Sequence, residues 1–482
     1  MSIQTPDWVK HAVFYQIYPD RFARTTRPAL PPEMQVPLES WDSLPTPQGY
    51  KGGDLWGIAE QLDYLQNLGI TAIYFTPIFS SASNHRYHTH DYYKIDPLLG
   101  GRAAFDHLLK AAHERDIKVV LDGVFNHASR GFLYFNDILE NGPHSPWLNW
   151  FSIEGWPLSA YDGEKLANYK SWINNRALPE FNYENAQARE YIMRVGEYWI
   201  AQGIDGWRLD VPFEIKTEGF WAEFRTRIKA INPEAYIVGE VWTDAREWLA
   251  GDQFDGVMNY LFTGPAIAFA AQDRVDMSLV KSVGYFPYPA LDAKGYAEKI
   301  EALFNLYDWE IHQTQLNLLS SHDIARILSV VGEDIASVEL ATLLLLTFPG
   351  APSIYYGDEV GLAGGLDPDC RRTFPPPSDW NQSLLATHKS LIALRHQYPA
   401  LRIGTYQTLA AEGDCYVFAR VLAEEMVVIA VNTGTASVQV RLADMAVTQG
   451  QVLYGVGHVD WLGDRTAMLD IPARAGIVLG TP

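Results

Sequence analysis

The chain has 482 residues, of which 48% are hydrophobic, and its formal net charge at pH 7 is −21. This length exceeds one small domain and is enough for one large barrel with additional parts. The strong negative charge argues against nucleic acid and against an anionic membrane surface as partners, and it suits a neutral substrate. The chain also contains 15 Trp and 26 Tyr residues, whose rings can pack against the apolar faces of sugars while their polar ends bind hydroxyls.

Cysteine content and the N-terminus bear on the cellular compartment. The two cysteines, Cys370 and Cys415, cannot form a disulfide framework, and we expect reduced thiols. The first residues contain no basic segment followed by an apolar run, so we expect no signal peptide. The longest apolar run, residues 343–348, is too short to span a bilayer. These features predict a cytoplasmic protein with no membrane partner.

Short apolar strands alternate with helical patterns over the first 400 residues. The expected strands begin near residues 13, 71, 118, 206, 236, 257, 316 and 353. The expected helices cover residues 55–68, 103–115, 186–202, 220–231, 338–347 and 383–397. Eight such units predict an α/β fold, a closed (β/α)8 TIM barrel rather than an open doubly wound sheet.

Two regions break this alternation. Residues 126–184, after the third strand, are rich in Trp, Asn, Gly and Pro, and an insertion of this length at the carboxyl ends of barrel strands predicts a substrate-shaping lobe. After about residue 400 the helical pattern stops, and strand-like segments with turn residues between them predict a C-terminal antiparallel β-sandwich domain. We therefore expect a catalytic barrel at 1–125 and 185–400, an inserted lobe at 126–184 and a C-terminal β domain at 401–482.

The expected strand at residues 203–211 carries a pair of opposite charges. Arg208 and Asp210 lie two residues apart and therefore share one face, while Leu209 and Val211 are expected to point into the barrel wall. A guanidinium keeps a neighbouring carboxylate ionised, which is what the nucleophile of covalent glycosyl transfer requires. Taken alone, such a pair is more often structural than catalytic.

Further polar clusters fall at the ends of other expected strands. Asp122, Asn126 and His127 follow the third strand, Glu240 ends the fifth, and residues 321–323 follow the seventh. In a closed barrel these ends converge on one mouth, where barrel active sites lie. Several carboxylates meeting there would repel one another and raise the pKa of at least one of them, which is difficult to explain as a structural feature. The clusters together therefore predict an active site.

These segments, in this order, resemble the four signature regions of the α-amylase family of glycoside hydrolases. They are residues 122–127 (DGVFNH), 206–210 (GWRLD), 239–242 (GEVW) and 321–323 (SHD). Three more segments resemble the neopullulanase, cyclomaltodextrinase and maltogenic amylase branch of that family, namely residues 15–22, 178–182 and 358–372. The resemblance extends over nearly the whole chain.

The resemblance implies a retaining glycoside hydrolase that cleaves α-1,4-glucosidic bonds of cyclodextrins, maltodextrins, pullulan or starch. It implies that Asp210 is the nucleophile, Glu240 the general acid and then base, and Asp323 a stabiliser of the transition state. It places Trp242 beyond the scissile bond and Tyr87 under the sugar that is cleaved. The substrate-binding residues that it implies are Tyr87, His127, Arg208, His322, Trp242, Asp367 and Arg371.

Three features depart from the branch. The first barrel strand begins near residue 13, so we expect that the branch's N-terminal β domain is absent, which leaves the oligomeric state open. Residues 23–28 replace a calcium loop rich in Asn and Asp, and the remaining half with Asp54 cannot supply the six or more oxygens that calcium takes. We therefore expect no required cofactor and no metal at that position. His88 stands where the branch usually has Asp, so exo preference stays open.

Two classes of alternative remain at this stage. An α-glucosidase or a glucan transglycosylase would use the same residues, because water and sugars compete for one glycosyl-enzyme. An inactive relative that only binds sugars would typically lack one of the three acids, whereas all three are present here. The expected partner is thus an α-glucan substrate rather than nucleic acid or a membrane.

Overall fold

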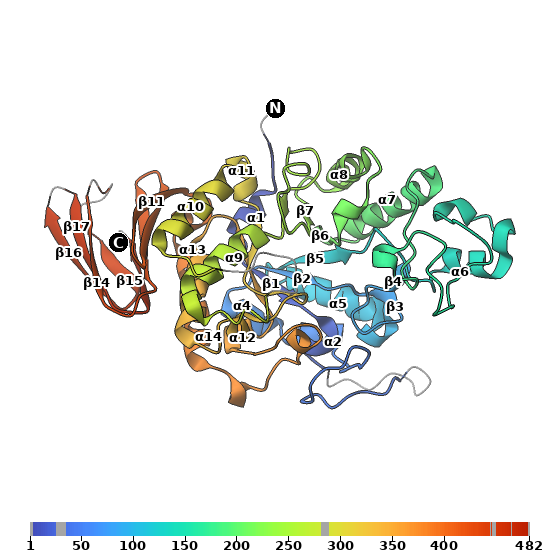
Figure 1. The fold of residues 1–482 in the computed structure, drawn as a ribbon, viewed down its shortest axis with the longest axis horizontal. Helices are drawn as coiled ribbons and strands as arrows, with labels where there is room; N and C mark the ends of the chain where they lie inside the picture. The colour runs from blue at the N-terminus through green and yellow to red at the C-terminus, as the bar shows by residue number, and fades with distance from the viewer. Residues whose placement is uncertain are drawn as a thin grey trace.

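The computed structural model describes residues 3–25, 35–280, 289–443, 445, 450–463 and 465–480. Figure 1 shows a central barrel, with the C-terminal strands at its left end and the segment that contains α6 (Leu133–Asn141) at its right end. The three parts follow the order that the sequence predicts, and the exact boundaries between them stay a prediction.

Eight parallel strands form the barrel, in the order β8-β7-β6-β5-β2-β1-β10-β9. A parallel bridge between Met258 and Leu316 connects the two outer strands and closes the sheet. Every residue of these strands is buried except Lys118, as expected for parallel strands that are covered on both faces. The TIM barrel prediction is therefore confirmed. The strands are β1 (Phe14–Ile17), β2 (Ala72–Phe75), β5 (Lys118–Gly123), β6 (Gly206–Leu209), β7 (Tyr236–Gly239), β8 (Gly256–Val257), β9 (Leu316–Leu318) and β10 (Ala351–Tyr355).

Helices surround the barrel, and several begin at a short polar side chain that accepts a hydrogen bond from the first turn. Asp54, Asn185, Asp292, Asp334 and Asn381 cap helices in this way. The helices are α1 (Asp7–His11), α2 (Pro19–Phe22), α3 (Leu55–Glu60), α4 (Leu62–Leu68), α5 (Gly101–His113), α7 (Ala186–Ala201), α8 (Phe220–Ile231), α9 (Tyr260–Ala271), α10 (Ala293–Phe304), α11 (Trp309–His312), α12 (Ile327–Val330), α13 (Ile335–Thr347), α14 (Gln382–Gln397) and α15 (Pro399–Ile403).

The single helix predicted at residues 55–68 is divided into α3 and α4. Gln61 leaves the helical region, with φ −99° and ψ 1°, and its N–H bonds to Ile58 as in a tight 3-10 turn. Ile58 and Leu62 both remain buried on either side of this turn. The break therefore lets both short helices direct their apolar residues towards the barrel.

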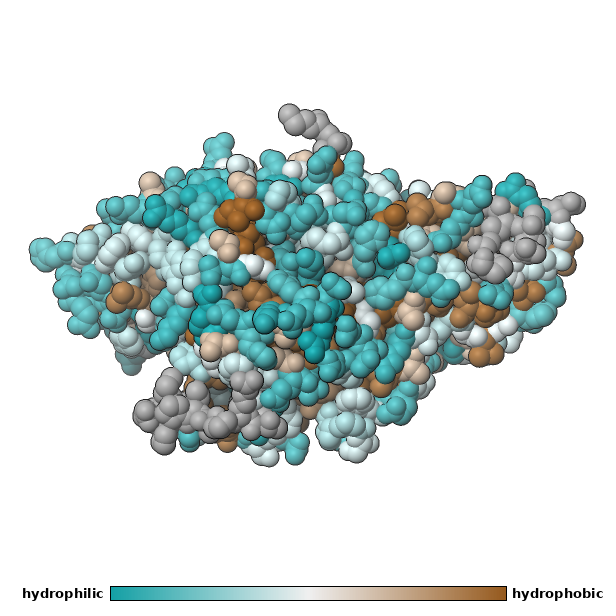
Figure 2. Space-filling view, turned by 180° about the vertical axis from the view of Figure 1, so that it is seen from behind, coloured by the Kyte–Doolittle hydropathy of each residue, from teal (hydrophilic) through white to brown (hydrophobic). Residues whose placement is uncertain are grey.

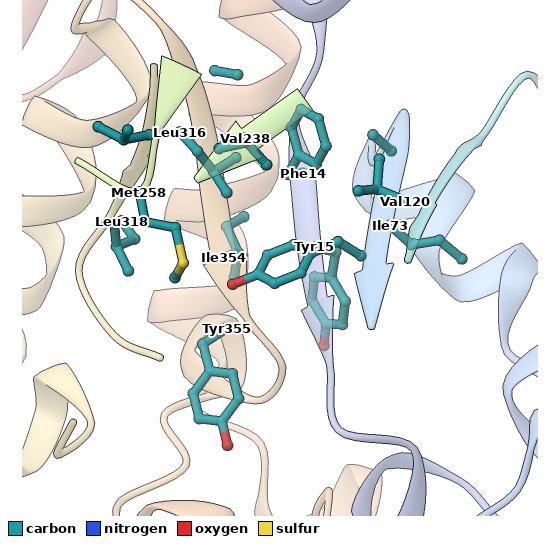
Figure 3. Close-up of a cluster of buried hydrophobic side chains, with 14 of the residues drawn as sticks. Phe14, Tyr15, Ile73, Val120, Val238, Met258, Leu316, Leu318, Ile354 and Tyr355 are labelled. Atoms are coloured by element: carbon teal, nitrogen blue, oxygen red, sulfur yellow. The ribbon is translucent and has the colours of Figure 1, made fainter. Parts of the chain in front are cut away.

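Apolar side chains from the barrel strands form one continuous core. Figure 3 shows Tyr15, Ile73, Val120, Val238 and Ile354 of this core packed closely together although they come from different strands. The packing holds the strands in fixed register, and that register determines where the polar residues at their ends lie.

The inserted segment lies between β5 and α7 and has little regular structure. It contains α6 and the 3-10 helices η3 (Gly142–His144), η4 (Leu148–Trp150) and η5 (Trp172–Asn174). Its core is aromatic, with Phe135 edge-on to Phe151 at 4.9 Å. An isolated bridge between His127 and Glu180 connects its start to its end, and one between Phe151 and Phe181 connects its middle to its end. Before it, β3 (Phe79–Ser81) and β4 (Thr89–Ile95) form a two-stranded sheet.

Two antiparallel sheets form the C-terminal part, as predicted. The five-stranded sheet has the order β11-β12-β13-β18-β15, and the three-stranded sheet the order β14-β17-β16. Apolar side chains of the two sheets form a second core cluster. The strands are β11 (Thr405–Glu412), β12 (Cys415–Leu422), β13 (Glu425–Asn432), β14 (Val438–Leu442), β15 (Gln451–Gly455), β16 (His458–Gly463), β17 (Thr466–Ile471) and β18 (Ala475–Gly480).

The helices, the cysteines and the surface show how the protein relates to a membrane and to solvent. Within the described parts of the chain, every helix is too short or too polar to cross a lipid bilayer. Cys370 and Cys415 are both buried and unpaired, as expected. The face in Figure 2 is mainly hydrophilic, with apolar residues in scattered small patches.

Candidate active site

Arg208 lies at the centre of the polar cluster at the carboxyl ends of the strands. It is fully buried on β6, and its Nη1 lies 3.0 Å from both carboxylate oxygens of Asp122 and 3.0 Å from Oδ1 of Asp210. Its Nη2 lies 3.0 Å from Oε2 of Glu240. One guanidinium thus brings together carboxyl groups from three neighbouring strands, as their positions at the strand ends predict.

Several carboxyl groups share this one cation, and burial raises the pKa of each of them. Burial raises the pKa of Asp122 to about 7, although Arg208 favours its charged form. Burial, together with the negative charge of Glu240, raises the pKa of Asp210. Burial raises the pKa of Glu240 as well, and Asp323 adds to this shift. The group therefore retains a proton at a higher pH than isolated carboxyls would, which is a requirement for general acid catalysis.

A cavity of about 490 Å³ opens above these acids. Most of the predicted catalytic and substrate-binding residues contribute to its lining, and Arg208 and His322 lie behind its wall. The structure thus brings most of these residues to one cavity, and their individual roles stay predictions. The lining residues are His85, Tyr87, His88, His127, Trp172, Asn175, Leu178, Asp210, Val211, Glu240, Trp242, Asp323, Asp367 and Arg371.

A chain of hydrogen bonds fixes Tyr87 in the cavity wall. Gln16 Nε2 donates to His322 Nδ1 at 2.8 Å, so the proton of the neutral ring is on Nε2. That nitrogen lies 2.6 Å from the Tyr87 hydroxyl, which donates in turn to Asp122 Oδ2 at 2.9 Å. Burial lowers the pKa of His322 well below its usual value, and this keeps the ring neutral. The Tyr87 ring also stacks on His322 with an interplanar angle of 7°.

Glu240 follows β7 and is held from two sides. Trp242 Nε1 donates to its Oε1 at 3.1 Å, and the backbone N–H of Val211 donates to its Oε2 at 3.1 Å. The preceding Gly239 allows a close approach, because a Cβ there would lie 2.7 Å from the ring of Phe254. These contacts fix the carboxyl group at the strand end, facing the cavity.

Val211 corrects one sequence-based prediction. It was expected to continue the strand and point into the barrel wall, but β6 ends at Leu209 and Val211 lines the cavity instead. Its φ of 35° and ψ of 51° lie in the left-handed region, which a β-branched residue rarely adopts. The turn aims its N–H at Glu240, so the strained backbone lies within the site itself.

An ion pair also contributes to the lining of the cavity. Arg371 Nη1 lies 3.0 Å from Asp367, and its Nη2 lies 3.5 Å from Oδ1 of Asp323. Beneath it, the Cys370 thiol donates to the His322 carbonyl at 3.3 Å. Burial raises the pKa of Cys370 to about 12, so this cysteine remains a packed thiol rather than a nucleophile.

Some lining residues were not among the predicted site residues. Trp172 of the inserted segment stacks on His127 with 5.2 Å between ring centroids. His85 and His88 could have been found from their position beside Tyr87. Asn175 lacks such a signal, because only the folding of the inserted segment brings it to the cavity, whereas Leu178 begins the segment 178–182 that resembles the branch.

In the region where the branch usually binds calcium, the carboxylate oxygens already accept hydrogen bonds from other groups of the protein. The Asp20 carboxylate accepts hydrogen bonds from the N–H groups of Lys51 and Gly52 and pairs with Arg21 at 2.8 Å, while Asp54 caps α3. Residues 26–28 of the replaced loop lie outside the described residues. Across the described segments, no cluster of His, Cys, Asp and Glu has the arrangement of a metal site. The expected absence of bound calcium stays a prediction.

Comparison with protein families gives two matches. Residues 16–373 match the model of the alpha amylase catalytic domain, and residues 404–474 match the alpha-amylase C-terminal domain. A cyclomaltodextrinase from Geobacillus thermopakistaniensis is 43% identical over 443 residues, which cover 91% of this chain and 71% of that protein. Neopullulanase 2 from Thermoactinomyces vulgaris is 41% identical over 442 residues, which cover 89% of this chain and 70% of that protein.

Solved structures with similar folds extend this comparison. A debranching enzyme from Nostoc punctiforme is 65% identical with a TM-score of 0.94, and the match covers 100% of both chains. A cyclic alpha-maltosyl-(1→6)-maltose hydrolase from Arthrobacter globiformis is 36% identical with a TM-score of 0.87, and the match covers 99% of this chain and 100% of that one.

Proposed function

The chain belongs to the α-amylase family of glycoside hydrolases, and we propose that it cleaves α-glucosidic bonds of maltodextrins, cyclodextrins and pullulan by a retaining double displacement. The observation that carries this proposal is the shared contact of Asp122, Asp210 and Glu240 with one buried guanidinium below an open cavity. A retaining glycosidase needs a nucleophilic carboxylate and a protonated carboxyl close together, and this arrangement supplies both.

In the first step, Glu240 donates its proton to the glycosidic oxygen while Asp210 attacks the anomeric carbon. The raised pKa of Glu240 supports its role as the acid. Contact with Arg208 supports the ionised form of Asp210 while Glu240 carries the proton. Asp323, on the cavity wall, would stabilise the positive charge that develops on the sugar ring.

In the second step, Glu240 takes a proton from water, which attacks the glycosyl-enzyme and releases Asp210. Tyr87 offers an aromatic face to the sugar ring, and its orientation is fixed by Asp122 and His322. His127, stacked on Trp172, faces the same cavity and can donate to a sugar hydroxyl. These side chains would position the sugar so that the attacking and leaving groups are aligned.

A second bond type is supported by the similar structures. The chain is 65% identical to the debranching enzyme over its full length and 36% identical to the cyclic alpha-maltosyl-(1→6)-maltose hydrolase. We therefore propose that α-1,6 bonds are also cleaved in the same cavity. Pullulan distinguishes the two bond types, because cleavage of its α-1,4 bonds releases panose and cleavage of its α-1,6 bonds releases maltotriose.

The test is to incubate the protein separately with β-cyclodextrin, pullulan, soluble starch and maltotriose and to resolve the products over time. Consumption of these glucans that is lost in Asp210→Asn would support the proposal. No consumption of any of them would overturn it. Exclusive release of glucose would favour an α-glucosidase, and products longer than the substrate would favour a transglycosylase.

A cytoplasmic location is also proposed. It is supported by a relative named intracellular maltogenic amylase, from Bacillus subtilis, which is 35% identical over 93% of this chain. Fractionation of the source cells, with the activity assayed in each fraction, tests it.

A further inference from the structure

Lys51 carries an amine that is buried beneath a loop of residues 38–50. A bridge between Leu38 and Tyr50 joins the two ends of this loop. The Glu39 N–H also donates to the Tyr50 carbonyl at 2.8 Å. Lys51 follows directly, and its side chain is 0% exposed. The side chain therefore turns back under the loop, whereas a lysine usually keeps its charged end in water.

Oxygen atoms of the loop surround the ammonium group and form an oxygen cage. Nζ of Lys51 donates to the carbonyl of Ser40 and to the carbonyl and the hydroxyl of Ser43, each at 2.6 Å. The Glu39 carboxylate lies 3.4 Å away and supplies the opposite charge. Such oxygens are also the ligands that proteins offer to hard metal cations. The three protons of the amine thus have three acceptors, and the amine occupies the place of a bound cation.

Gly49 allows the oxygen cage to close. A Cβ at Gly49 would lie 1.9 Å from Oε1 of Glu39, so a larger residue would displace this carboxylate. The same oxygen accepts a hydrogen bond from the Thr46 hydroxyl. Both halves of the loop therefore meet at the carboxylate that faces Lys51, and these contacts offset the cost of burying a charge.

The loop contacts one segment of the catalytic cavity through Asn84. Nδ2 of Asn84 donates to the carbonyls of Pro47 and Gly49 at 3.1 and 2.8 Å. Asn84 directly precedes His85 and lies three residues before Tyr87, and both of these line the catalytic cavity. A displacement of the loop would therefore reach the aromatic ring that faces the sugar.

The loop contacts a second segment of the lining through Trp41. The Thr373 hydroxyl donates to the Trp41 carbonyl at 2.7 Å, and Trp41 Nε1 donates to the Phe374 carbonyl at 3.3 Å. These partners follow Arg371, which lines the catalytic cavity. One loop thus connects two lining segments that are far apart in the sequence, and Lys51 holds this loop from beneath.

We propose that the Lys51 ammonium is a built-in cation that orders the 38–50 loop and thereby positions the two lining segments that the loop contacts. Lys51 acts through the loop, so it is a positioning residue rather than a catalytic one. It follows that a small alkylammonium ion can replace the amine when the side chain is shortened. The effect on catalysis rests on the function proposed above, whereas the oxygen cage does not.

Chemical rescue tests the inference. Lys51→Ala removes the amine and leaves the oxygens, and we expect kcat/KM for maltotriose to fall at least about tenfold, because displaced positioning groups slow the reaction. n-Propylammonium has the length of the missing atoms and is expected to raise kcat/KM again at least about fivefold, in a saturable manner. Tetramethylammonium has the same charge but no N–H donor, so it controls for ionic strength and should have no effect.

Further variants separate charge from packing. Lys51→Met fills the same space without a charge, so kcat/KM falls as well but n-propylammonium does not raise it again. Ser43→Ala removes one acceptor at an exposed position and should lower kcat/KM about two- to threefold, even if the fold does not tolerate an empty cage. Lys110→Ala, whose side chain is 77% exposed on α5, is the matched control and should change nothing.

Cleavage of the loop by chymotrypsin gives a readout that does not depend on activity. The cuts are mapped by mass spectrometry, and Trp41 provides a site within the loop. Lys51→Ala is expected to be cut there at least about fivefold faster than the natural chain, because cleavage requires the loop to open. n-Propylammonium should slow this cleavage, and tetramethylammonium should not.

The outcomes separate this inference from the proposed function. Unchanged cleavage in Lys51→Ala, or faster cleavage that n-propylammonium does not reverse, overturns the built-in cation. Faster cleavage with unchanged kcat/KM overturns the positioning role. Absence of maltotriose consumption by the natural chain overturns the proposed hydrolase, and the cleavage rates then decide on the oxygen cage alone.

Discussion

At the scale of single residues, the site depends on an imbalance of charge between one buried cation and several buried acids. Arg208 contacts Asp122, Asp210 and Glu240 at 3.0 Å, so its charge balances only part of theirs. Removing a buried partner of this kind leaves charges without compensation and is strongly destabilising. Arg208 therefore positions the acids as well as balancing part of their charge. Substitutions of the acids test the catalytic roles more clearly than a substitution of Arg208, which would also destabilise the fold.

Glu240→Gln tests the role of the general acid. The amide cannot protonate a leaving sugar oxygen, so we expect kcat/KM for maltotriose to fall at least about a thousandfold. α-Maltosyl fluoride releases fluoride, which needs no protonation, so formation of the glycosyl-enzyme from this substrate is expected to fall far less. The measurement is the rate of fluoride release in a single turnover.

Asp210→Asn is the matched comparison for this variant. Loss of the nucleophile is expected to reduce turnover of both maltotriose and the fluoride to a similar extent, because both need the covalent intermediate. Equal losses on both substrates in Glu240→Gln would contradict the assignment of Glu240 as the acid.

At the scale of elements, short turns after the barrel strands direct the polar groups. The turn after β6 places Val211 in the left-handed region and aims its N–H at Glu240. After β10, the 3-10 helix η8 (Asp358–Val360) places Glu359 in the interior, where Tyr15 of β1 and Tyr64 of α4 donate to the same oxygen at 2.8 and 2.7 Å. Glu359 thus connects three elements, and within the described parts of the chain no cationic side chain pairs with it.

Glu359 is expected to make stability depend on pH. Burial raises its pKa from 4.5 to about 7, so the folded state binds this proton more tightly than the unfolded state. The stabilising contribution of protonated Glu359 is complete below pH 4.5 and is lost as the pH rises to 7 and above. The shift corresponds to a decrease of about 3 kcal/mol at most in the free energy of unfolding.

The measurement is urea unfolding of the natural chain and of Glu359→Gln at pH 5 and pH 8. The variant cannot gain or lose this proton, so its stability lacks the pH dependence that Glu359 contributes. From pH 5 to pH 8, the free energy of unfolding should therefore decrease by more in the natural chain than in the variant. An identical pH dependence in both proteins would show that Glu359 does not titrate in this range.

Much of the barrel and of the acid cluster could be predicted from the sequence because each has a strong local signal. Buried parallel strands form continuous apolar runs, and polar residues such as Asp122 and Glu240 stand out directly at or after their ends. The break at Gln61 and the turn at Val211 lack such a signal, since backbone geometry there is imposed by packing of other segments. The oxygen cage around Lys51 could not be predicted either, because it depends on how residues 38–50 fold back over this lysine.

At the scale of the whole molecule, the C-terminal sheets are attached to the barrel by buried arginines. Arg420 of β12 donates to the carbonyls of Thr347, Leu401 and Gly404 at 2.7–2.9 Å. Arg395 of α14 donates to the carbonyls of Leu401 and Gly350. Their guanidinium groups satisfy the carbonyls at the end of α13 and around α15, where otherwise no water could reach them.

Arg420→Met tests this attachment. The substituted side chain retains its apolar stem but removes the donor to the buried carbonyls of Thr347 and Gly404, so we expect a loss of about 2–4 kcal/mol in the free energy of unfolding. Arg441→Met, at an exposed position on β14 of the same sheets, removes an equal charge and is expected to change stability by less than about 0.5 kcal/mol. Both variants should retain the kcat of the natural chain below the unfolding transition, because Arg420 contacts no residue of the catalytic cavity. Equal stability of the two variants would mean that packing between the sheets and the barrel, rather than these hydrogen bonds, holds the two parts together.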